Sequence, residues 1–225
     1  MPAYTHLISD CDGVLLDSEA IAFDALLLQL APLLPGQDLD TLVRPRLGLT
    51  LPDLLADIGR QHPLPLGDDA IAAMRHHIED EVARLARPIR GVDAALRAIP
   101  LPKACASNSA ANRVRSSLAQ TGLLAHFGPH VYCADEVGIA KPDPGLFLHA
   151  ARGLGASPAR CLVVEDSVTG TRAASAAGMT VLGFTGAGHI ADGQAQRLRD
   201  CGARHTFDDM ADLPALVARL CQAQP

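Results

Sequence analysis

The chain has 225 residues with a formal net charge of −6; 48% of the residues are hydrophobic and 20% are charged. This composition is typical of a folded globular protein with a substantial core, and it excludes an intrinsically disordered chain. The acidic balance, with arginines scattered among acidic residues, argues against a nucleic acid as partner, because phosphate-backbone binding usually shows a basic stripe.

The chain also lacks the signals of export or membrane insertion. No stretch approaches the roughly 18 apolar residues that a membrane span needs, and no secretory signal opens the sequence. The six cysteines show no C-x-x-C spacing, which disfavours a zinc ribbon or a redox motif. We expect a reducing, cytoplasmic location without a membrane partner, and a monomer or weak dimer.

The first predicted strand is an apolar run that ends in two aspartates, Asp10 and Asp12, followed by Gly13. Ligands of open α/β sheets bind outside the carboxyl ends of the strands, so carboxylates at this tip are placed for chemistry. A calcium loop can also begin with D-x-D-G, but here apolar residues 14–16 follow instead of further oxygen ligands.

Residues 17–87 show helical patterning throughout, divided by prolines and glycines into short helices. Asp17 or Ser18 is predicted to cap the first helix. Its apolar positions are Ile21, Ala22, Ala25, Leu26 and Leu28. The last helix is predicted over residues 68–85. Its apolar face consists of Ile71, Met74, Ile78, Val82 and Leu85. The segment is therefore predicted to be a compact helical insertion.

From residue 88 onward, short strands alternate with helices. The predicted strands cover residues 104–106, 131–133, 161–164 and 180–184, with a weak strand at 205–207. A helix capped by Ser107 or Ser109 follows the first of these strands, and the final helix spans 212–220. This alternation predicts a doubly wound parallel α/β sheet with right-handed crossovers.

The predicted chain therefore has a discontinuous Rossmann-like core, residues 1–16 and 88–225, with an all-helical insertion at 17–87. The carboxyl ends of its parallel strands meet at one edge of the sheet. The polar residues expected along that edge are Asp10, Asp12, Ser107, Glu165 and Asp166.

Four segments resemble, in order, the four motifs of the haloacid dehalogenase superfamily. They are Asp10 to Val14, Ser107-Asn108, Lys141 to Pro144, and Glu165 to Gly170. The resemblance covers nearly the whole chain. The helical insertion after the first motif is similar to the cap of the subfamily that includes β-phosphoglucomutase, phosphoglycolate phosphatase and sugar-phosphate phosphatases.

The resemblance implies a role for each motif residue. Asp10 would attack phosphorus to form an aspartyl-phosphate, and Asp12 would transfer protons to and from the leaving alcohol and water. Ser107 and Lys141 would bind phosphoryl oxygens. The cofactor implied is Mg²⁺, an ion that prefers oxygen ligands. Its implied ligands are the Asp10 side chain, the Asp12 backbone carbonyl, Asp166 and, as a helper, Glu165.

Substrate contacts are predicted for three further residues, Asn108, Arg46 and Glu19. Arg46 is equally compatible with a solvated charge, and Glu19 with the start of a helix. The expected enzyme is a Mg²⁺-dependent phosphatase acting on a small phosphorylated metabolite, such as a sugar or sugar-acid phosphate.

Departures from relatives narrow the activity that the resemblance implies. Dehalogenases of this superfamily lack the second aspartate of the first motif, so the presence of Asp12 favours phosphoryl transfer over carbon–halogen cleavage. Related enzymes that hydrolyse phosphonates use a Schiff-base lysine in the cap, and this cap has no lysine, which argues against that reaction. A β-phosphoglucomutase-like mutase is the alternative, although Ala22 and Leu51 stand where such mutases carry a histidine and an arginine. A non-catalytic binding protein is the third hypothesis, which the intact motifs disfavour.

Overall fold

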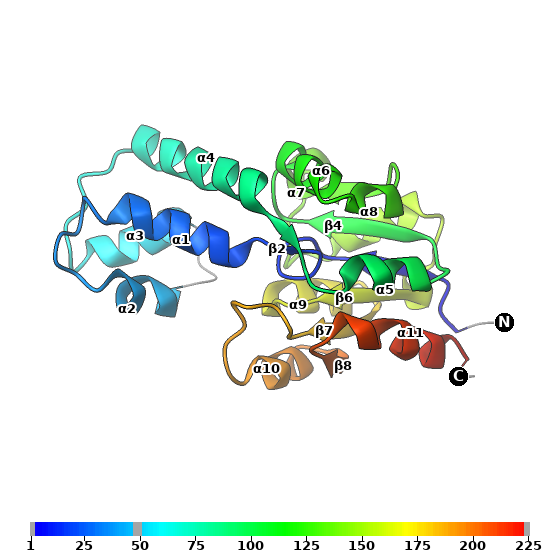
Figure 1. The fold of residues 1–225 in the computed structure, drawn as a ribbon. Helices are drawn as coiled ribbons and strands as arrows, with labels where there is room; N and C mark the ends of the chain where they lie inside the picture. The colour runs from blue at the N-terminus through cyan, green and yellow to red at the C-terminus, as the bar shows by residue number, and fades with distance from the viewer. Residues whose placement is uncertain (1–2, 47–50, 223–225) are drawn as a thin grey trace. The chain divides into compact units, whose positions relative to one another are not determined.

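The computed structural model describes residues 3–46 and 51–222. Its larger sheet has six strands, all parallel, in the order β5-β4-β1-β6-β7-β8 (Figure 1). The strands are β1 (His6–Ser9), β4 (Lys103–Ser107), β5 (Val131–Cys133), β6 (Cys161–Glu165), β7 (Thr180–Phe184) and β8 (Ala203–Phe207). The predicted parallel α/β architecture is confirmed, and the strand predicted as weak is β8.

The register of the central strands fixes where their polar ends meet. In β1, Ser9 pairs with Cys105 of β4 and with Val164 of β6. Asp10 therefore lies level with Glu165, the last residue of β6, and one residue before the level of Ser107, the last residue of β4. Strand order and register together bring residues from three remote segments to one edge of the sheet.

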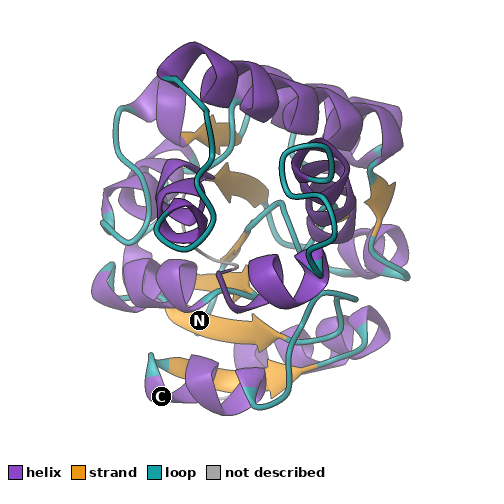
Figure 2. Cartoon of the chain, turned by 90° about the vertical axis from the view of Figure 1, so that its left-hand side faces the viewer, coloured by secondary structure: helices purple, strands orange, loops and turns teal. Residues whose placement is uncertain are grey.

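Helices connect and enclose these strands (Figure 2). They are α5 (Val92–Ala98), α6 (Ala111–Gln120), α7 (Ala134–Val137), α8 (Gly145–Gly153), α9 (Val168–Ala176), α10 (Gln194–Asp200) and α11 (Leu213–Gln222). The sequence pattern did not predict α7 and α10. Both are short, with four and seven residues, so neither offers the length over which a helical period can be recognised.

The core of the sheet is apolar on both faces. Helices α8, α9 and α10 share one buried cluster with alternate strand residues, for example Phe147 of α8 with Ile8 and Val163. The intervening strand residues Leu7 and Leu162 are equally buried. Near-continuous apolar strands of this kind are typical of a sheet covered by helices on both sides.

The helical insertion folds around its own apolar cluster, in which Leu30, Val43, Ile58 and Met74 are buried. Its helices are α1 (Glu19–Leu30), α2 (Leu39–Val43), α3 (Leu51–Gly59) and α4 (Asp68–Leu85), with a short 3₁₀ turn η1 (Arg44–Arg46). The bounds of α4 confirm the predicted last helix. Among the described residues, no helix is long and apolar enough to cross a membrane.

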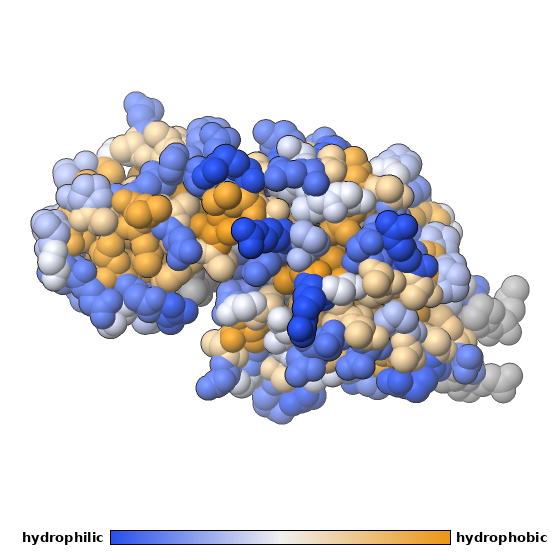
Figure 3. All heavy atoms as spheres, in the orientation of Figure 1, coloured by the Kyte–Doolittle hydropathy of each residue, from blue (hydrophilic) through white to orange (hydrophobic). Residues whose placement is uncertain are grey.

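Two residues assigned from the sequence to apolar faces lie at the surface instead. Leu28 is 75% exposed and Leu85 is 40% exposed. Leu28 follows Leu26 by two residues, a spacing that turns a side chain away from the buried face of a helix. Leu85 is the last residue of α4, where the helix ends. The surface of the helical insertion also shows apolar side chains (Figure 3).

The described residues form two compact units, one of residues 3–18 with 86–222 and the other of residues 19–46 with 51–85. Where the chain leaves and re-enters the first unit, β2 (Leu16–Asp17) pairs antiparallel with β3 (Arg87–Pro88). The pairing of these two short strands holds both crossing points together. The domain boundaries given in the sequence analysis stay a prediction.

The predicted cap of helix α6 is wrong, because the hydroxyl group has another partner. Helix α6 follows Ala110, which provides no side-chain cap, and the Ser109 hydroxyl instead donates to Asp12. A partner distant in the chain has displaced the local cap. Helix α1 begins at Glu19, directly after Ser18, whose hydroxyl also donates to Asp12; the cap of this helix stays a prediction.

Candidate active site

Three buried carboxylates gather at the carboxyl ends of β1 and β6. They belong to Asp10, Glu165 and Asp166, and one oxygen from each lies within 4.8 Å of the others. Buried carboxylates repel one another and are rarely left together without a cation. Carboxylate oxygens are the donors that hard divalent cations prefer, so this set of donors fits such an ion.

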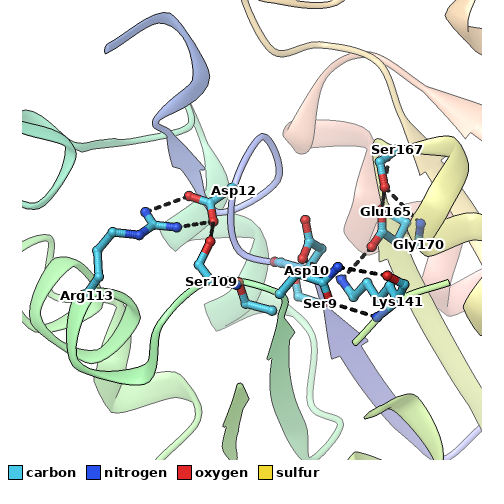
Figure 4. A network of polar contacts seen from close by, with 11 residues as sticks. Ser9, Asp10, Asp12, Ser109, Arg113, Lys141, Glu165, Ser167 and Gly170 are labelled. Carbon is cyan, nitrogen blue, oxygen red and sulfur yellow. Dashed lines mark hydrogen bonds and ion pairs between the residues drawn. The ribbon is translucent and has the colours of Figure 1, made fainter. Parts of the chain in front are cut away.

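Lys141 lies against two of these carboxylates. Its Nζ donates to Asp10 Oδ1 and to Glu165 Oε1, both at 2.6 Å, and its side chain is 4% exposed (Figure 4). Burial alone would lower the pKa of Lys141, but the charges of Asp10 and Glu165 raise it above its usual value. Lys141 therefore stays protonated and offsets part of the negative charge of the cluster.

The negative charge that Lys141 does not offset contributes to the raised pKa values of Asp10 and Asp166. Burial raises the pKa of Asp10 well above its usual value, Lys141 opposes this rise, and the nearby charges of Glu165 and Asp166 add to it. Burial also raises the pKa of Asp166, although His189 Nε2, 3.1 Å from Asp166 Oδ2, partly counteracts it. Both directions follow from concentrated negative charge in a buried site.

Glu165 is fully buried and is held by the start of the following helix. Its Oε2 accepts from the backbone N–H of Ser167 at 3.1 Å and from the Ser167 hydroxyl at 2.9 Å. The same hydroxyl accepts from the N–H of Gly170 and so caps α9. A single serine thus joins the helix N-terminus to the carboxylate that holds Lys141.

We expect the substitution Gly170→Ala to destabilise the protein by about 1–3 kcal/mol, the range for overpacking a tight site. A Cβ at this helical position would overlap the Glu165 carboxylate. In a helix, alanine is normally more stable than glycine by up to about 1 kcal/mol. Helix propensity alone therefore predicts that Gly170→Ala stabilises the protein. Equilibrium unfolding in urea measures the difference.

Gly59→Ala is the matched control, because Gly59 is also helical and a Cβ there meets nothing within 4 Å. It is expected to be neutral or stabilising. If Gly170→Ala were as stable as Gly59→Ala, the close approach of helix α9 to Glu165 would not be a constraint on the fold.

Asp12 lies in a second polar network on the other side of Asp10. Its Oδ1 accepts from the Ser18 hydroxyl at 2.5 Å, and its Oδ2 accepts from the Ser109 hydroxyl at 2.7 Å. Arg113 donates to both oxygens, at 2.9 and 2.5 Å (Figure 4). Burial on its own would raise the pKa of Asp12, but the charge and hydrogen bonds of Arg113, with both hydroxyls, lower it to about 2.

The turn after Asp12 depends on Gly13. Its φ of +76° lies in the left-handed region, which glycine adopts without strain. A Cβ at Gly13 would overlap the carboxylate of Asp166 and lie 2.9 Å from Cε1 of His189. The glycine therefore allows the backbone of the first motif to pass directly beside Asp166.

The two residues at the end of β4 have distinct surroundings. Ser107 is 1% exposed, and its hydroxyl accepts from the backbone N–H of Ser109 at 3.1 Å. The Asn108 side chain donates to the Lys141 carbonyl at 3.0 Å and accepts from the Lys141 N–H at 2.8 Å. Asn108 thus fixes the backbone of Lys141, a positional function that the sequence analysis did not predict.

The two remaining predicted residues belong to the helical insertion. Arg46 donates to Asp57 at 2.5 Å and to the Leu42 carbonyl at 2.6 Å, so its guanidinium is bound within the insertion. Glu19 is the first residue of α1. Their contact with a substrate stays a prediction.

Sequence reasoning missed Arg113 and His189. Arg113 is one of several arginines of the chain, and nothing local separates it from Arg115 two residues later. The sequence pattern assigns no role to the loop that contains His189. In the same region, the Gln194 side chain donates to the Asp166 carbonyl at 2.6 Å. The only sequence signal for Arg113 and His189 is that each comes after a strand that ends at the site.

Comparison with known proteins places the chain among phosphatases. It is 30% identical to a 6-phosphogluconate phosphatase of Escherichia coli (strain K12) over 78% of this chain and 80% of that one. It is 31% identical to a plasmid phosphoglycolate phosphatase of Cupriavidus necator, covering 97% and 96% of the two chains.

A solved structure with the same fold is a conserved haloacid dehalogenase-like protein of unknown function from Agrobacterium tumefaciens str. C58. It superposes with a TM-score of 0.88 at 36% identity, over 97% of this chain and 100% of that one. The model of the haloacid dehalogenase-like hydrolase family matches residues 4–178, which include both polar networks around Asp10 and Asp12. The chain therefore belongs to the haloacid dehalogenase-like hydrolases and is a phosphatase-type enzyme of that family.

Proposed function

We propose that this protein is a Mg²⁺-dependent phosphatase that hydrolyses a small phosphorylated metabolite, a sugar or sugar-acid phosphate, through an aspartyl-phosphate. The observation that carries the proposal is the buried cluster of Asp10, Glu165 and Asp166 with Lys141 in contact. A buried cation site beside a lysine is suited to a phosphate group, whose charge would otherwise be repelled by the carboxylates.

In this proposal Asp10 is the nucleophile. It follows the central strand β1 and lies between Asp12 on one side and Glu165 with Lys141 on the other (Figure 4). Attack of an Asp10 oxygen on phosphorus forms the new P–O bond as the bond to the alcohol oxygen breaks, and the phosphate passes to the enzyme. Water then attacks phosphorus and releases inorganic phosphate, so one displacement becomes two easier steps.

The proton transfers are assigned to Asp12, two residues after the nucleophile. A group that is to protonate the leaving alcohol and later deprotonate water must lie within hydrogen-bond reach of both. The side chain of Asp12 is 17% exposed, and an oxygen that is to reach the ligand exchanges one of its present hydrogen bonds for it. Such proton transfer typically contributes about 10²- to 10⁴-fold to the rate.

Lys141 and Ser107 are assigned to the phosphoryl oxygens. Lys141 is a fixed, charged donor beside Asp10, and Asn108 holds its backbone in place. Fixed donors of this kind stabilise the charge of the transferring group without reorganising during the reaction. Ser107 ends the neighbouring strand β4 at the same edge of the sheet.

The metal in this proposal is Mg²⁺, held by the side chains of Asp10 and Asp166 and by the Asp12 carbonyl, with Glu165 as a helper. When bound, it would neutralise charge between the carboxylates and the phosphate. In the same site Glu165 also keeps Lys141 in position, and Gly13 lets the Asp12 backbone approach Asp166.

Release of inorganic phosphate from a panel of phosphorylated metabolites tests the proposal. With Mg²⁺ and no added bisphosphate, we expect phosphate release with a measurable kcat/KM, and loss of activity on complete chelation that added Mg²⁺ reverses. Activity that survives chelation would contradict the metal assignment. An isomeric sugar phosphate formed without inorganic phosphate would indicate the mutase, and no turnover on any compound a binding protein.

A further inference from the structure

The segment that follows β7 contacts Asp166 twice, and the proposed mechanism uses neither contact. His189 Nε2 lies 3.1 Å from Asp166 Oδ2, and the Gln194 side chain donates to the Asp166 carbonyl at 2.6 Å. Both residues come from one stretch of chain, His189 from the loop after β7 and Gln194 from the first position of α10. This stretch therefore holds both the backbone and the side chain of Asp166.

The contact with His189 fixes one particular oxygen of Asp166. An ionised carboxylate can only accept hydrogen bonds, so His189 Nε2 is the donor whenever Asp166 is ionised. The same oxygen also lies against the backbone of the first motif, because a Cβ at Gly13 would overlap Oδ2 and come within 2.9 Å of His189 Cε1. With a donor on one side and Gly13 on another, Oδ2 has little room to turn.

The other clustered carboxylates are also held through hydrogen bonds to individual oxygens (Figure 4). Lys141 donates to Asp10 Oδ1 and to Glu165 Oε1. Ser167 donates to Glu165 Oε2. Among the residues that the structure describes, none donates to Asp10 Oδ2 or to Asp166 Oδ1. Asp10 and Asp166 therefore each offer one oxygen to a cation.

The number of oxygens that a carboxylate offers helps to decide which divalent cation binds. Mg²⁺ takes about six ligands, keeps several waters among them and is usually bound through one or two carboxylates. Ca²⁺ takes about six to eight oxygen ligands and often binds both oxygens of one carboxylate. To offer both oxygens, Asp166 would have to turn Oδ2 away from His189. The hydrogen bond from His189 therefore opposes Ca²⁺ more than Mg²⁺.

We propose that His189 makes the cation site selective for Mg²⁺ over Ca²⁺, because it holds Asp166 as a carboxylate with one available oxygen. His189 is thus a positioning residue, which acts on the cation through Asp166. This inference rests on the proposed function, and it adds the residue that distinguishes the two ions. Loss of a hydrogen-bond partner of a metal-binding carboxylate typically changes metal affinity about 10- to 100-fold.

Binding of Mg²⁺ and of Ca²⁺, each alone and without substrate, tests the proposal. Each ion competes with Mn²⁺ for the chelator-treated protein, and the electron paramagnetic resonance signal of free Mn²⁺ gives both dissociation constants. We expect the wild-type protein to bind Mg²⁺ more tightly than Ca²⁺. His189→Leu fills a similar volume but cannot donate, and it should reduce the ratio of the Ca²⁺ to the Mg²⁺ dissociation constant about 10- to 100-fold.

Two amides distinguish the hydrogen bond from a general disturbance of the loop. His189→Gln can place an amide nitrogen where Nε2 of His189 lies and should restore most of the ratio, whereas the shorter His189→Asn should not. His189→Asn also replaces His189→Leu if the latter folds poorly. The matched control is His126→Leu, because His126 Nε2 lies 2.8 Å from a carboxylate outside the cluster, that of Asp93. It should leave the ratio unchanged.

A wild-type ratio in His189→Leu, equal ratios in His189→Gln and His189→Asn, or no preference for Mg²⁺ in the wild-type protein would overturn the inference. Phosphate release from the metabolite panel separates it from the proposed function. If phosphoesters are hydrolysed with Mg²⁺ and His189→Leu keeps the wild-type ratio, the phosphatase stands and the role of His189 is wrong. If no phosphoester is hydrolysed while the ratio depends on His189 as expected, the phosphatase fails and the selective cation site stands.

Discussion

Replacing Asp10 by asparagine is expected to lower kcat/KM for any phosphoester substrate on the order of 10⁴- to 10⁶-fold, as for loss of a covalent nucleophile. The amide has nearly the shape of the carboxylate but cannot attack phosphorus. The uncharged amide also avoids the burial of a charge and the repulsion with Glu165 and Asp166, which together raise the pKa of Asp10 in the folded protein. The fold should therefore persist, although one partner of Lys141 is weakened.

Steady-state phosphate release measures this effect, with circular dichroism and thermal unfolding to show that the variant is folded. Peptide mapping verifies that the substitution persists, since an asparagine can deamidate back to aspartate. Asp135→Asn is a suitable control, because Asp135 accepts from the Ala111 N–H at the start of α6 and is not one of the three clustered carboxylates. Activity of Asp10→Asn within tenfold of wild type would show that another group attacks phosphorus.

Lys141→Met is expected to produce the largest loss of stability, about 3–5 kcal/mol in the metal-free protein, as when one partner of a buried ion pair is removed. Methionine fills a similar volume, but Asp10 and Glu165 then lose the cation that both contact at 2.6 Å. Activity should also fall, by about 10²- to 10³-fold, because a fixed donor to the phosphoryl group is missing.

The free energy of unfolding of Lys141→Met is measured in urea, first with a chelator and then with excess Mg²⁺. The comparison distinguishes a loss of charge from a loss of packing. If the loss is electrostatic, Mg²⁺ should stabilise Lys141→Met more than it stabilises the wild-type protein, because a bound cation replaces part of the missing charge. The matched control is Lys103→Met, at the only other lysine of the chain. Lys103 is partly exposed and donates to the carbonyls of Ile99 and Leu101, so its loss should cost about 1 kcal/mol.

Equal destabilisation by both lysine substitutions, with no added effect of Mg²⁺, would contradict the assignment of Lys141 as the counter-charge of the cluster. The two variants therefore distinguish an electrostatic role at this site from a general effect of removing a lysine. The result also tests the metal site, because only a cation bound among the carboxylates can replace the missing charge of Lys141 and stabilise Lys141→Met more than the wild-type protein.

Much of the fold could be predicted because its signals are local. The buried strand β6 is a run of apolar residues ending in Glu165, and α4 shows a helical period over its whole length of 18 residues. The alternation of such elements implies parallel strands, and parallel strands place their carboxyl ends together. Short elements such as α7 and β2 carry too few residues for a period to be recognised.

The sequence by itself also determined which groups the acidic cluster contains, since Asp10, Glu165 and Asp166 stand at the carboxyl ends of strands that had to end at one edge. Only the tertiary structure decided how these groups are paired. Arg113 meets Asp12 across 101 positions of sequence, and His189 meets Asp166 across 23. Such pairings depend on strand register and on the position of a helix over its strand, whereas a local pattern fixes only the period and ends of an element.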